Sequence, residues 1–148
     1  MAIDVRPMTP DDFPWVIALN QKHVPAVSDA EGERFAYLFE RSAIALTAWV
    51  DGSPAGFSLT MTHGLDYDSS NYQWFSENYD QFIYLDRVVV DASFHQHGVG
   101  RALYSETERL GLLKVPDAEV KLCEALKACE SATASWQMEP VNHDGLRC

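Results

Sequence analysis

Several short stretches of the chain carry the hydrophobic pattern of β-strands, in which residues that share a face recur every second position. Residues 3–6 form the first, and residues 44–50 and 55–62 flank Asp51-Gly52, a dipeptide typical of a two-residue hairpin turn. The run at 82–90 is the most strand-like of all and predicts a central strand. The pattern therefore predicts a sheet that contains a hairpin.

Other stretches have helical spacing. Thr9 has the character of an N-cap before an amphipathic segment that ends at Pro25, and Pro14 predicts that the regular helix begins near it. Residues 29–42 predict a second helix, and residues 100–113 a third. With the strands, these helices give a mixed α+β arrangement.

Residues 64–80 are polar and aromatic and predict a long loop. The concentration of large rings argues against disorder. Two interpretations remain open: an aromatic wall that binds an amine by cation–π contact, or a hydrophobic cluster beneath a loop. The rings concerned are Tyr67, Tyr72, Trp74 and Phe75.

Composition narrows the possible functions. The chain has 148 residues, 47% of them hydrophobic, which fits one domain with a packed core. A net charge of −11 disfavours nucleic acid and anionic membrane surfaces as partners. It is compatible with a cationic substrate such as an amine, and equally with a solvated acidic surface. We expect the three cysteines to be free thiols, and we expect no metal site. Because the sequence shows no leader and no membrane-spanning pattern, we expect a cytoplasmic location.

The most informative stretch runs from Asp86 to Tyr104. A β-branched run ends in a short polar loop with two glycines, and a helix follows. Strand, glycine loop and helix together form an anion site, because backbone amides and the helix dipole point at the ligand. A P-loop would need Lys-Ser/Thr after Gly100, and a dinucleotide fold would need three glycines after the first strand; neither is present.

The loop His95-Gln96-His97-Gly98-Val99-Gly100-Arg101 resembles the Gln/Arg-x-x-Gly-x-Gly/Ala loop of the GNAT superfamily of N-acetyltransferases. The element order is also similar, and the resemblance covers about residues 3–124. Further stretches resemble a bacterial subgroup of that family. They are Leu19-Asn20, Val24-Pro25-Ala26-Val27, Tyr67-Asp68-Ser69, Asn71-Tyr72, Trp74-Phe75 and Asp86-Arg87.

The resemblance implies a GNAT-like acyl-CoA N-acyltransferase fold in a single domain (1–148), with a mostly antiparallel sheet flanked by helices. It also implies that the loop amides hold the pyrophosphate of acetyl-CoA, while the edge of Val88, Val89 and Val90 pairs with the pantetheine arm. The position of His95 is usually Gln or Arg in the family, so a fixed cation is replaced by a titratable group.

Asp86 is the candidate base that removes a proton from the attacking amine, and Tyr84, on the same face, is the candidate lining of the acceptor pocket. Structural alternatives are a buried network of Asp86 and Arg87, or a capping carboxylate, and core packing for Tyr84. Adjacent strand residues face opposite ways, so we expect no direct Asp86–Arg87 pair. The predicted activity is acetyl transfer to a primary amine of a small molecule or peptide. The alternatives are a non-catalytic acyl-CoA-binding or regulatory module and a protein-interaction domain that uses the loop from Tyr67 to Phe75.

The resemblance fades after Leu113. Residues 119–124 can form the expected fifth strand, but residues 125–132 have helical character, and the C-terminal strands of the fold are missing or altered in the tail at 125–148. Codons for residues 127–131, read one base later, can spell Lys-Pro-Ala-Asn-Pro, which resembles the loop expected there. A frameshift near Glu124 would explain this, and codon degeneracy could produce it by chance. An exposed sheet edge would favour a homodimer.

Overall fold

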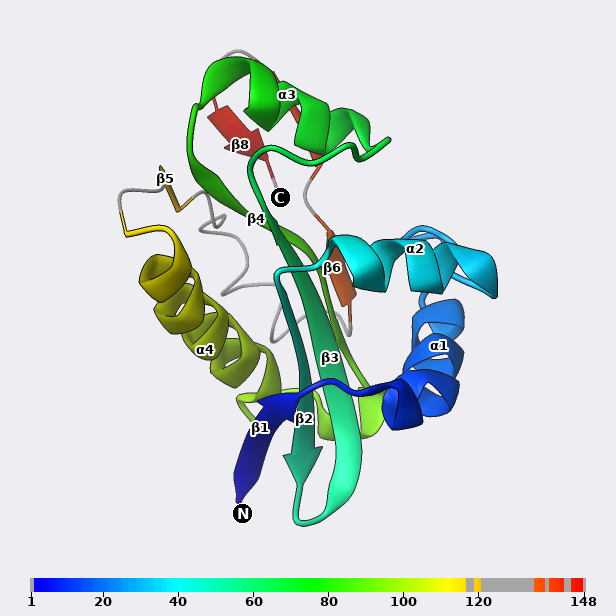
Figure 1. Ribbon diagram of the computed structural model, residues 1–148. Coiled ribbons are helices and arrows are strands. Elements are labelled where there is room, and N and C mark those ends of the chain that lie inside the picture. Colours follow the sequence, from blue (N-terminus) through cyan, green and yellow to red (C-terminus); the bar gives the residue numbers. More distant parts are fainter. Residues whose placement is uncertain (1, 117–118, 121–134, 138, 143–144, 148) are drawn as a thin grey trace.

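The computed structural model describes residues 2–116, 119–120, 135–137, 139–142 and 145–147. Four antiparallel strands lie side by side in chain order and form the body of the main sheet (Figure 1). They are β1 (Ile3–Pro7), β2 (Ile44–Val50), β3 (Ser53–Thr62) and β4 (Phe82–Val90). The predicted mixed α+β class is confirmed.

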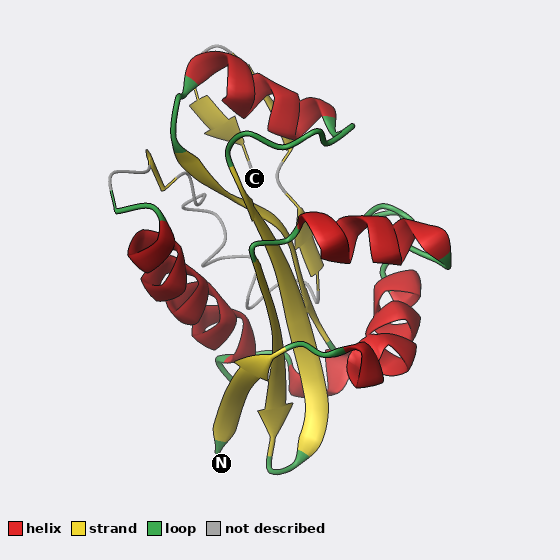
Figure 2. Cartoon of the chain, viewed as in Figure 1, coloured by secondary structure: helices red, strands yellow, loops and turns green. Residues whose placement is uncertain are grey.

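Helices cover both faces of this sheet. The helices α1 (Phe13–Lys22) and α2 (Glu33–Arg41) lie on one face, and α4 (Val99–Lys114) lies on the other (Figures 1 and 2). The remaining helical elements are η1 (Pro10–Asp12), α3 (Ser70–Asn78) and η2 (Ala92–Phe94). The core between the layers contains fully buried side chains from sheet and helices, such as Phe35 of α2 against Phe57 of β3.

Most element predictions hold, with two differences. As predicted, the first helix begins at Phe13, beside Pro14. The predicted hairpin turn is also present, because Asp51 and Gly52 have the positive φ values, 49° and 83°, that a primed turn requires. The second helix is shorter than predicted, because Gly32 at φ 58° precedes its start. The loop prediction for 64–80 is wrong in its centre, where α3 forms after Ser69 caps its first turn by accepting a hydrogen bond from Tyr72 N at 3.3 Å.

Strand β4 contains a β-bulge at Asp86. Leu59 of β3 lies opposite Arg87, while the next residue, Thr60, lies opposite Leu85, so Asp86 is the extra residue. The bulge changes the alternation of faces: Asp86 and Arg87 both point toward α1 and α2. The expectation that these neighbours face opposite ways is therefore wrong, since it assumes an unbroken two-residue period.

The C-terminal segment adds short strands to the outer edge of β4. The strand β5 (Glu119–Val120) pairs in parallel with Phe82 and Ile83, which confirms the start of the predicted fifth strand. Three more short strands follow, although the sequence predicts no clear strand there. They are β6 (Ser135–Gln137), β7 (Glu139–Asn142) and β8 (Gly145–Arg147), the last two forming a separate pair. The helix predicted at 125–132 and the three cysteines lie outside the described residues.

Candidate active site

The glycine loop connects the end of β4 to α4. Asp91 Oδ1 accepts a hydrogen bond from Ser93 N at 2.8 Å and starts η2, after which Gln96 and Gly98 have positive φ values of 66° and 84°. A residue other than glycine rarely adopts the left-handed conformation of Gly98, which ends the loop. The helix starts at the next residue, so the amides of its first turn have no acceptor within the helix and face the loop.

The side chains of this loop are arranged around that helix end. Gln96, His97 and Arg101 are exposed, whereas Val99 and Gly100 are buried. The ring of His95 is half-buried, and its Nε2 atom is buried with no hydrogen-bond partner among the described residues. The loop therefore combines backbone donors with a buried imidazole nitrogen that lacks a hydrogen-bond partner among the described residues.

The outer edge of β4 changes neighbour along its length. Among the described residues it pairs in parallel with β5 at Phe82 and Ile83, and from Arg87 to Val89 it pairs antiparallel with β6. The residues assigned to pantetheine pairing, Val88, Val89 and Val90, thus lie partly in a ladder with the chain's own C-terminal segment. A ligand that adds to this edge must replace β6 there.

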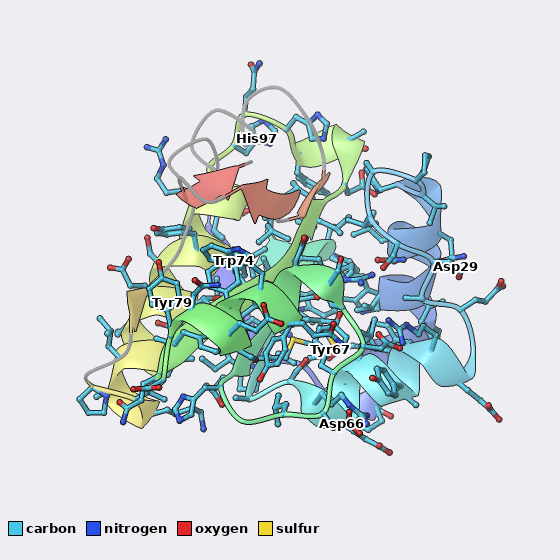
Figure 3. All side chains as sticks on the ribbon, turned by 90° about the horizontal axis from the view of Figure 1, so that it is seen from above. Asp29, Asp66, Tyr67, Trp74, Tyr79 and His97 are labelled. Carbon is cyan, nitrogen blue, oxygen red and sulfur yellow. The ribbon has the colours of Figure 1, made fainter. Side chains whose placement is uncertain are left out.

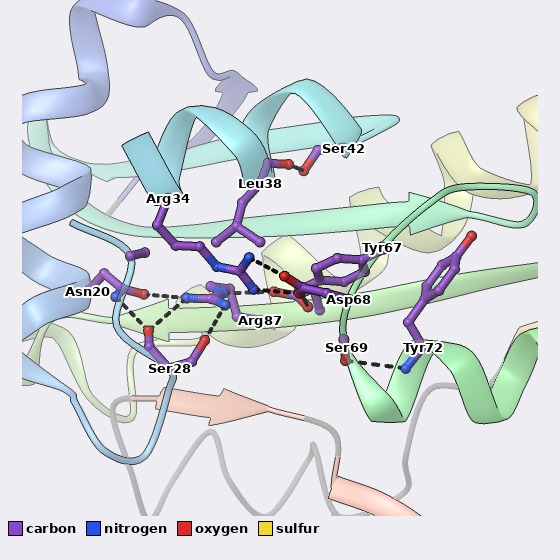
Figure 4. A network of polar contacts seen from close by, with 12 residues as sticks. Asn20, Ser28, Arg34, Leu38, Ser42, Tyr67, Asp68, Ser69, Tyr72 and Arg87 are labelled. Atoms are coloured by element: carbon purple, nitrogen blue, oxygen red, sulfur yellow. Dashed lines mark hydrogen bonds and ion pairs between the residues drawn. The ribbon is translucent and has the colours of Figure 1, made fainter. Parts of the chain in front are cut away.

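Asp86 and Arg87 form a buried ion pair beside the bulge, with both side chains 0% exposed. Arg87 Nε donates to Asp86 Oδ2 at 2.8 Å, and Tyr67 Oη donates to Asp86 Oδ1 at 2.5 Å (Figure 4). The remaining guanidinium nitrogens donate to Asn20 and Ser28. The structure therefore contains the Asp86–Arg87 network that was one of the structural alternatives for Asp86, and catalysis by Asp86 stays a prediction.

The aromatic residues of the 64–80 segment belong to the core. Tyr67, Tyr72 and Phe75 are buried, and Trp74 packs edge-on against Phe75, with ring centroids 5.2 Å apart. Figure 3 labels Tyr67 and Trp74 of this segment. Tyr84 lies among them, and its hydroxyl is buried with no partner among the described residues. These contacts favour the interpretation of a hydrophobic cluster.

Burial also sets the chemistry of two of these hydroxyls. Desolvation, and then the neighbouring Asp86 charge, raise the pKa of Tyr67 far above its usual value. The same two causes raise the pKa of Tyr84. Both phenols therefore stay protonated at pH values at which an exposed tyrosine ionises.

One cavity that the described residues outline lies elsewhere. It has a volume of about 520 Å³ and lies beyond the end of β1, between the C-terminal ends of α2 and α4, lined by residues such as Met8, Phe39 and Leu110. None of the candidate site residues lines it. Within the described part of the chain no group of three or more His, Cys, Asp or Glu could hold a metal ion, and no helix is long and apolar enough to cross a membrane.

A family model described as the acetyltransferase (GNAT) family matches residues 8–126, a range that includes the bulged strand, the glycine loop and α4. The chain belongs to the GNAT family of acetyltransferases. No curated protein sequence matches it. The GNAT family resemblance predicted from the loop is therefore confirmed, and acyl transfer from an acyl-CoA is the activity of the family.

Solved structures support the GNAT fold. The aminoglycoside N-acetyltransferase AAC(6')-Iy, in complex with a bisubstrate analogue, has a TM-score of 0.64 at 19% identity, with all of both chains covered. Ard1 from Thermoplasma volcanium has a TM-score of 0.59 at 19% identity, with 77% of this chain and 66% of that chain covered. AAC(6')-Ih from Acinetobacter baumannii has a TM-score of 0.59 at 12% identity, with 88% and 86% covered. At these identities the comparisons establish the fold alone.

The GNAT site also contains residues that the sequence analysis did not single out. Asn20 and Ser28 bind Arg87, and Tyr67 was considered only as part of an aromatic surface. A signal was available, because the stretches Leu19-Asn20 and Tyr67-Asp68-Ser69 carry the resemblance. What the sequence lacked was any indication that these stretches meet at the bulge.

Proposed function

We propose that this protein transfers the acetyl group of acetyl-CoA to a primary amine. The observation that carries the proposal is the glycine loop, in which a left-handed Gly98 directs the first-turn amides of α4 outward at the end of β4. In the reaction the amine nitrogen attacks the thioester carbonyl, the new C–N bond forms, the C–S bond breaks, and the nitrogen loses a proton. Coenzyme A leaves as the thiol.

The proposed cofactor site follows β4 and continues into α4. The amides of the loop at 95–101 would hold the pyrophosphate, with His95 as an additional donor, and the edge at 88–90 would pair with the amide groups of the pantetheine arm. In this arrangement the thioester would lie near the middle of β4, next to the bulge at Asp86.

The proposed acceptor is a cationic small molecule or a peptide amine. The net charge of −11 supports a cationic acceptor, and aminoglycoside and protein N-acetyltransferases are among the structures with the same fold. Tyr84 and Asp86 are the predicted catalytic residues on the acceptor side. Because Asp86 is fully buried and bonded on both oxygens, its use as a base requires the release of Tyr67 or Arg87.

Calorimetry with acetyl-CoA tests the proposed function. We expect binding in the low-micromolar range or weaker, and a loss of at least about tenfold in Gly98→Val, because a β-branched residue at φ 84° distorts the loop. Gly52→Val is the matched control, since Gly52 has a φ of 83° in a distant hairpin turn with open space around it. No binding by the folded wild-type protein, or an equal loss in both variants, would contradict the proposal.

One observation favours the alternative, a non-catalytic acyl-CoA-binding module. Asp86, the predicted base, is fully buried and accepts hydrogen bonds on both oxygens. Measurement of free coenzyme A thiol with an amine panel separates the two functions. Thiol release that depends on an amine supports the transferase, whereas binding without release supports the module.

A further inference from the structure

Arg87 binds a segment that is distant in sequence, residues 23–32 between α1 and α2. Its Nη1 donates to the Asn20 side-chain oxygen at 3.0 Å and to the Ser28 carbonyl at 3.1 Å, and its Nη2 donates to Ser28 Oγ at 2.8 Å (Figure 4). Asn20 Nδ2 donates to the same carbonyl at 3.1 Å. Although it lacks regular structure around Ser28, this segment is therefore attached to the central strand.

Asp86 binds a second irregular segment, residues 63–69 between β3 and α3, through Tyr67. The outer side of that segment is attached to α2. Arg34 donates twice to Asp68, at 2.8 and 2.9 Å, and Arg41 Nε donates to the Asp66 carbonyl at 2.6 Å. Tyr67 is thus held between the ion pair and α2.

Stability alone does not account for this arrangement. Desolvation of two charges largely cancels their attraction, and apolar residues of similar volume commonly serve the core equally well. What the guanidinium provides is geometry, because its planar fork fixes the direction of several donors at once. The structure uses four of these hydrogen bonds, three of them to residues 20 and 28.

We propose that Asp86 and Arg87 form a positioning pair that holds segments 23–32 and 63–69 as the two walls of the acceptor site. The proposal rests on the proposed acetyl transfer, because the thioester on the edge of β4 would meet an acceptor on the face to which both segments are attached. The segments contain four acidic residues and no lysine or arginine. Asp68 is paired with Arg34, and the charges of Asp29, Glu31 and Asp66 fit an acceptor with several amino groups. Arg87 acts through these segments, so its effect is on acceptor binding and not on the cofactor.

Steady-state kinetics test the pair with kanamycin, spermidine and an alanine-terminated peptide as acceptors. Ser28→Ala deletes one hydrogen bond to Arg87, and Ser42→Ala, which deletes a bond of the same length (2.8 Å) to Leu38 O, is the matched control. We expect Ser28→Ala to raise the acceptor KM at least about fivefold, while the calorimetric Kd for acetyl-CoA and the parameters of Ser42→Ala change less than about twofold. Arg87→Lys, which keeps the charge but loses the fork, should raise the same KM further.

Each outcome decides the proposal. If wild-type protein binds acetyl-CoA and acetylates an amine, but Ser28→Ala and Ser42→Ala have the same acceptor KM, the positioning role is wrong and the proposed function stands. If Ser28→Ala weakens acetyl-CoA binding equally, the role is general structure. If no amine of the three is acetylated, hydrogen exchange decides: the amides of 23–32 must exchange faster in Ser28→Ala than in Ser42→Ala, or the proposal fails.

Discussion

Replacement of the buried ion pair tests the energetics of the bulge directly. Asp86→Leu leaves the Arg87 guanidinium unpaired in a fully buried position and removes the acceptor of Tyr67. An uncompensated buried charge costs about 3–5 kcal/mol, and a buried hydroxyl without its partner about 1 kcal/mol. We therefore expect Asp86→Leu to lower the free energy of unfolding by about 4–6 kcal/mol, a large part of the total for a domain of this size.

The double variant carries the decisive prediction. Asp86→Leu/Arg87→Met has no buried charge, but Tyr67, the Asn20 side-chain oxygen and the Ser28 hydroxyl each lose a hydrogen bond, which costs about 3 kcal/mol in total at about 1 kcal/mol each. The Ser28 carbonyl also loses Arg87 but keeps its hydrogen bond from Asn20 Nδ2. Arg87→Met should thus destabilise the wild-type protein, yet stabilise the Asp86→Leu protein by about 1–3 kcal/mol.

Urea unfolding followed by tryptophan fluorescence measures all four proteins of this cycle. Asp4→Leu is the matched control, because Asp4 pairs with Arg6 at 2.6 Å on the surface, where the two side chains are 58% and 50% exposed, and its loss should cost less than about 1 kcal/mol. Additive effects of the two substitutions, or a cost of Asp86→Leu equal to that of Asp4→Leu, would refute the reasoning.

Three further predictions concern other parts of the molecule. Gly56→Ala should destabilise the protein by about 1–3 kcal/mol in the same assay, because the new Cβ would lie 2.6 Å from the Val89 carbonyl oxygen, a backbone atom that cannot move aside; a neutral effect would show that the strands separate easily. Burial raises the pKa values of Tyr67 and Tyr84 in the folded state, so the two phenols ionise at lower pH in the unfolded state. The free energy of unfolding should therefore fall as pH rises through about 10. Absorbance at alkaline pH should show these two phenols ionising only together with unfolding. Trp136→Pro removes a backbone N–H from the β6 ladder. If the cofactor replaces β6, this substitution should lower the Kd for acetyl-CoA that calorimetry measures. A higher Kd would show that β6 helps to build the site.

Much of the fold follows from local patterns in the sequence. The hairpin at 51–52 depends on two residues that accept positive φ, and α4 follows a glycine loop and has its own amphipathic spacing. Such features need no information from distant residues. The same holds for the glycine loop, whose chemistry lies almost entirely in its backbone.

The acceptor side could not be predicted in this way. The bulge at Asp86 arises from the pairing of β3 with β4, and a single extra residue leaves no periodic signal in a run of nine residues. The partners of Arg87 come from sequence separations of 59 and 67 residues. The helix α3 was missed because its apolar rings gather against β4 in a segment that is polar by composition.

The bulge has a consequence for how the chain tolerates insertions and deletions. Asp86 is the extra residue, so its deletion would leave Arg87 opposite Leu59 and Leu85 opposite Thr60 in a ladder without the bulge. The pairing of the three valines that follow would be unchanged, but Arg87 and Tyr67 would lose the acceptor that they share. Deletion of Asp86 should therefore preserve the sheet and break the polar network at its carboxylate.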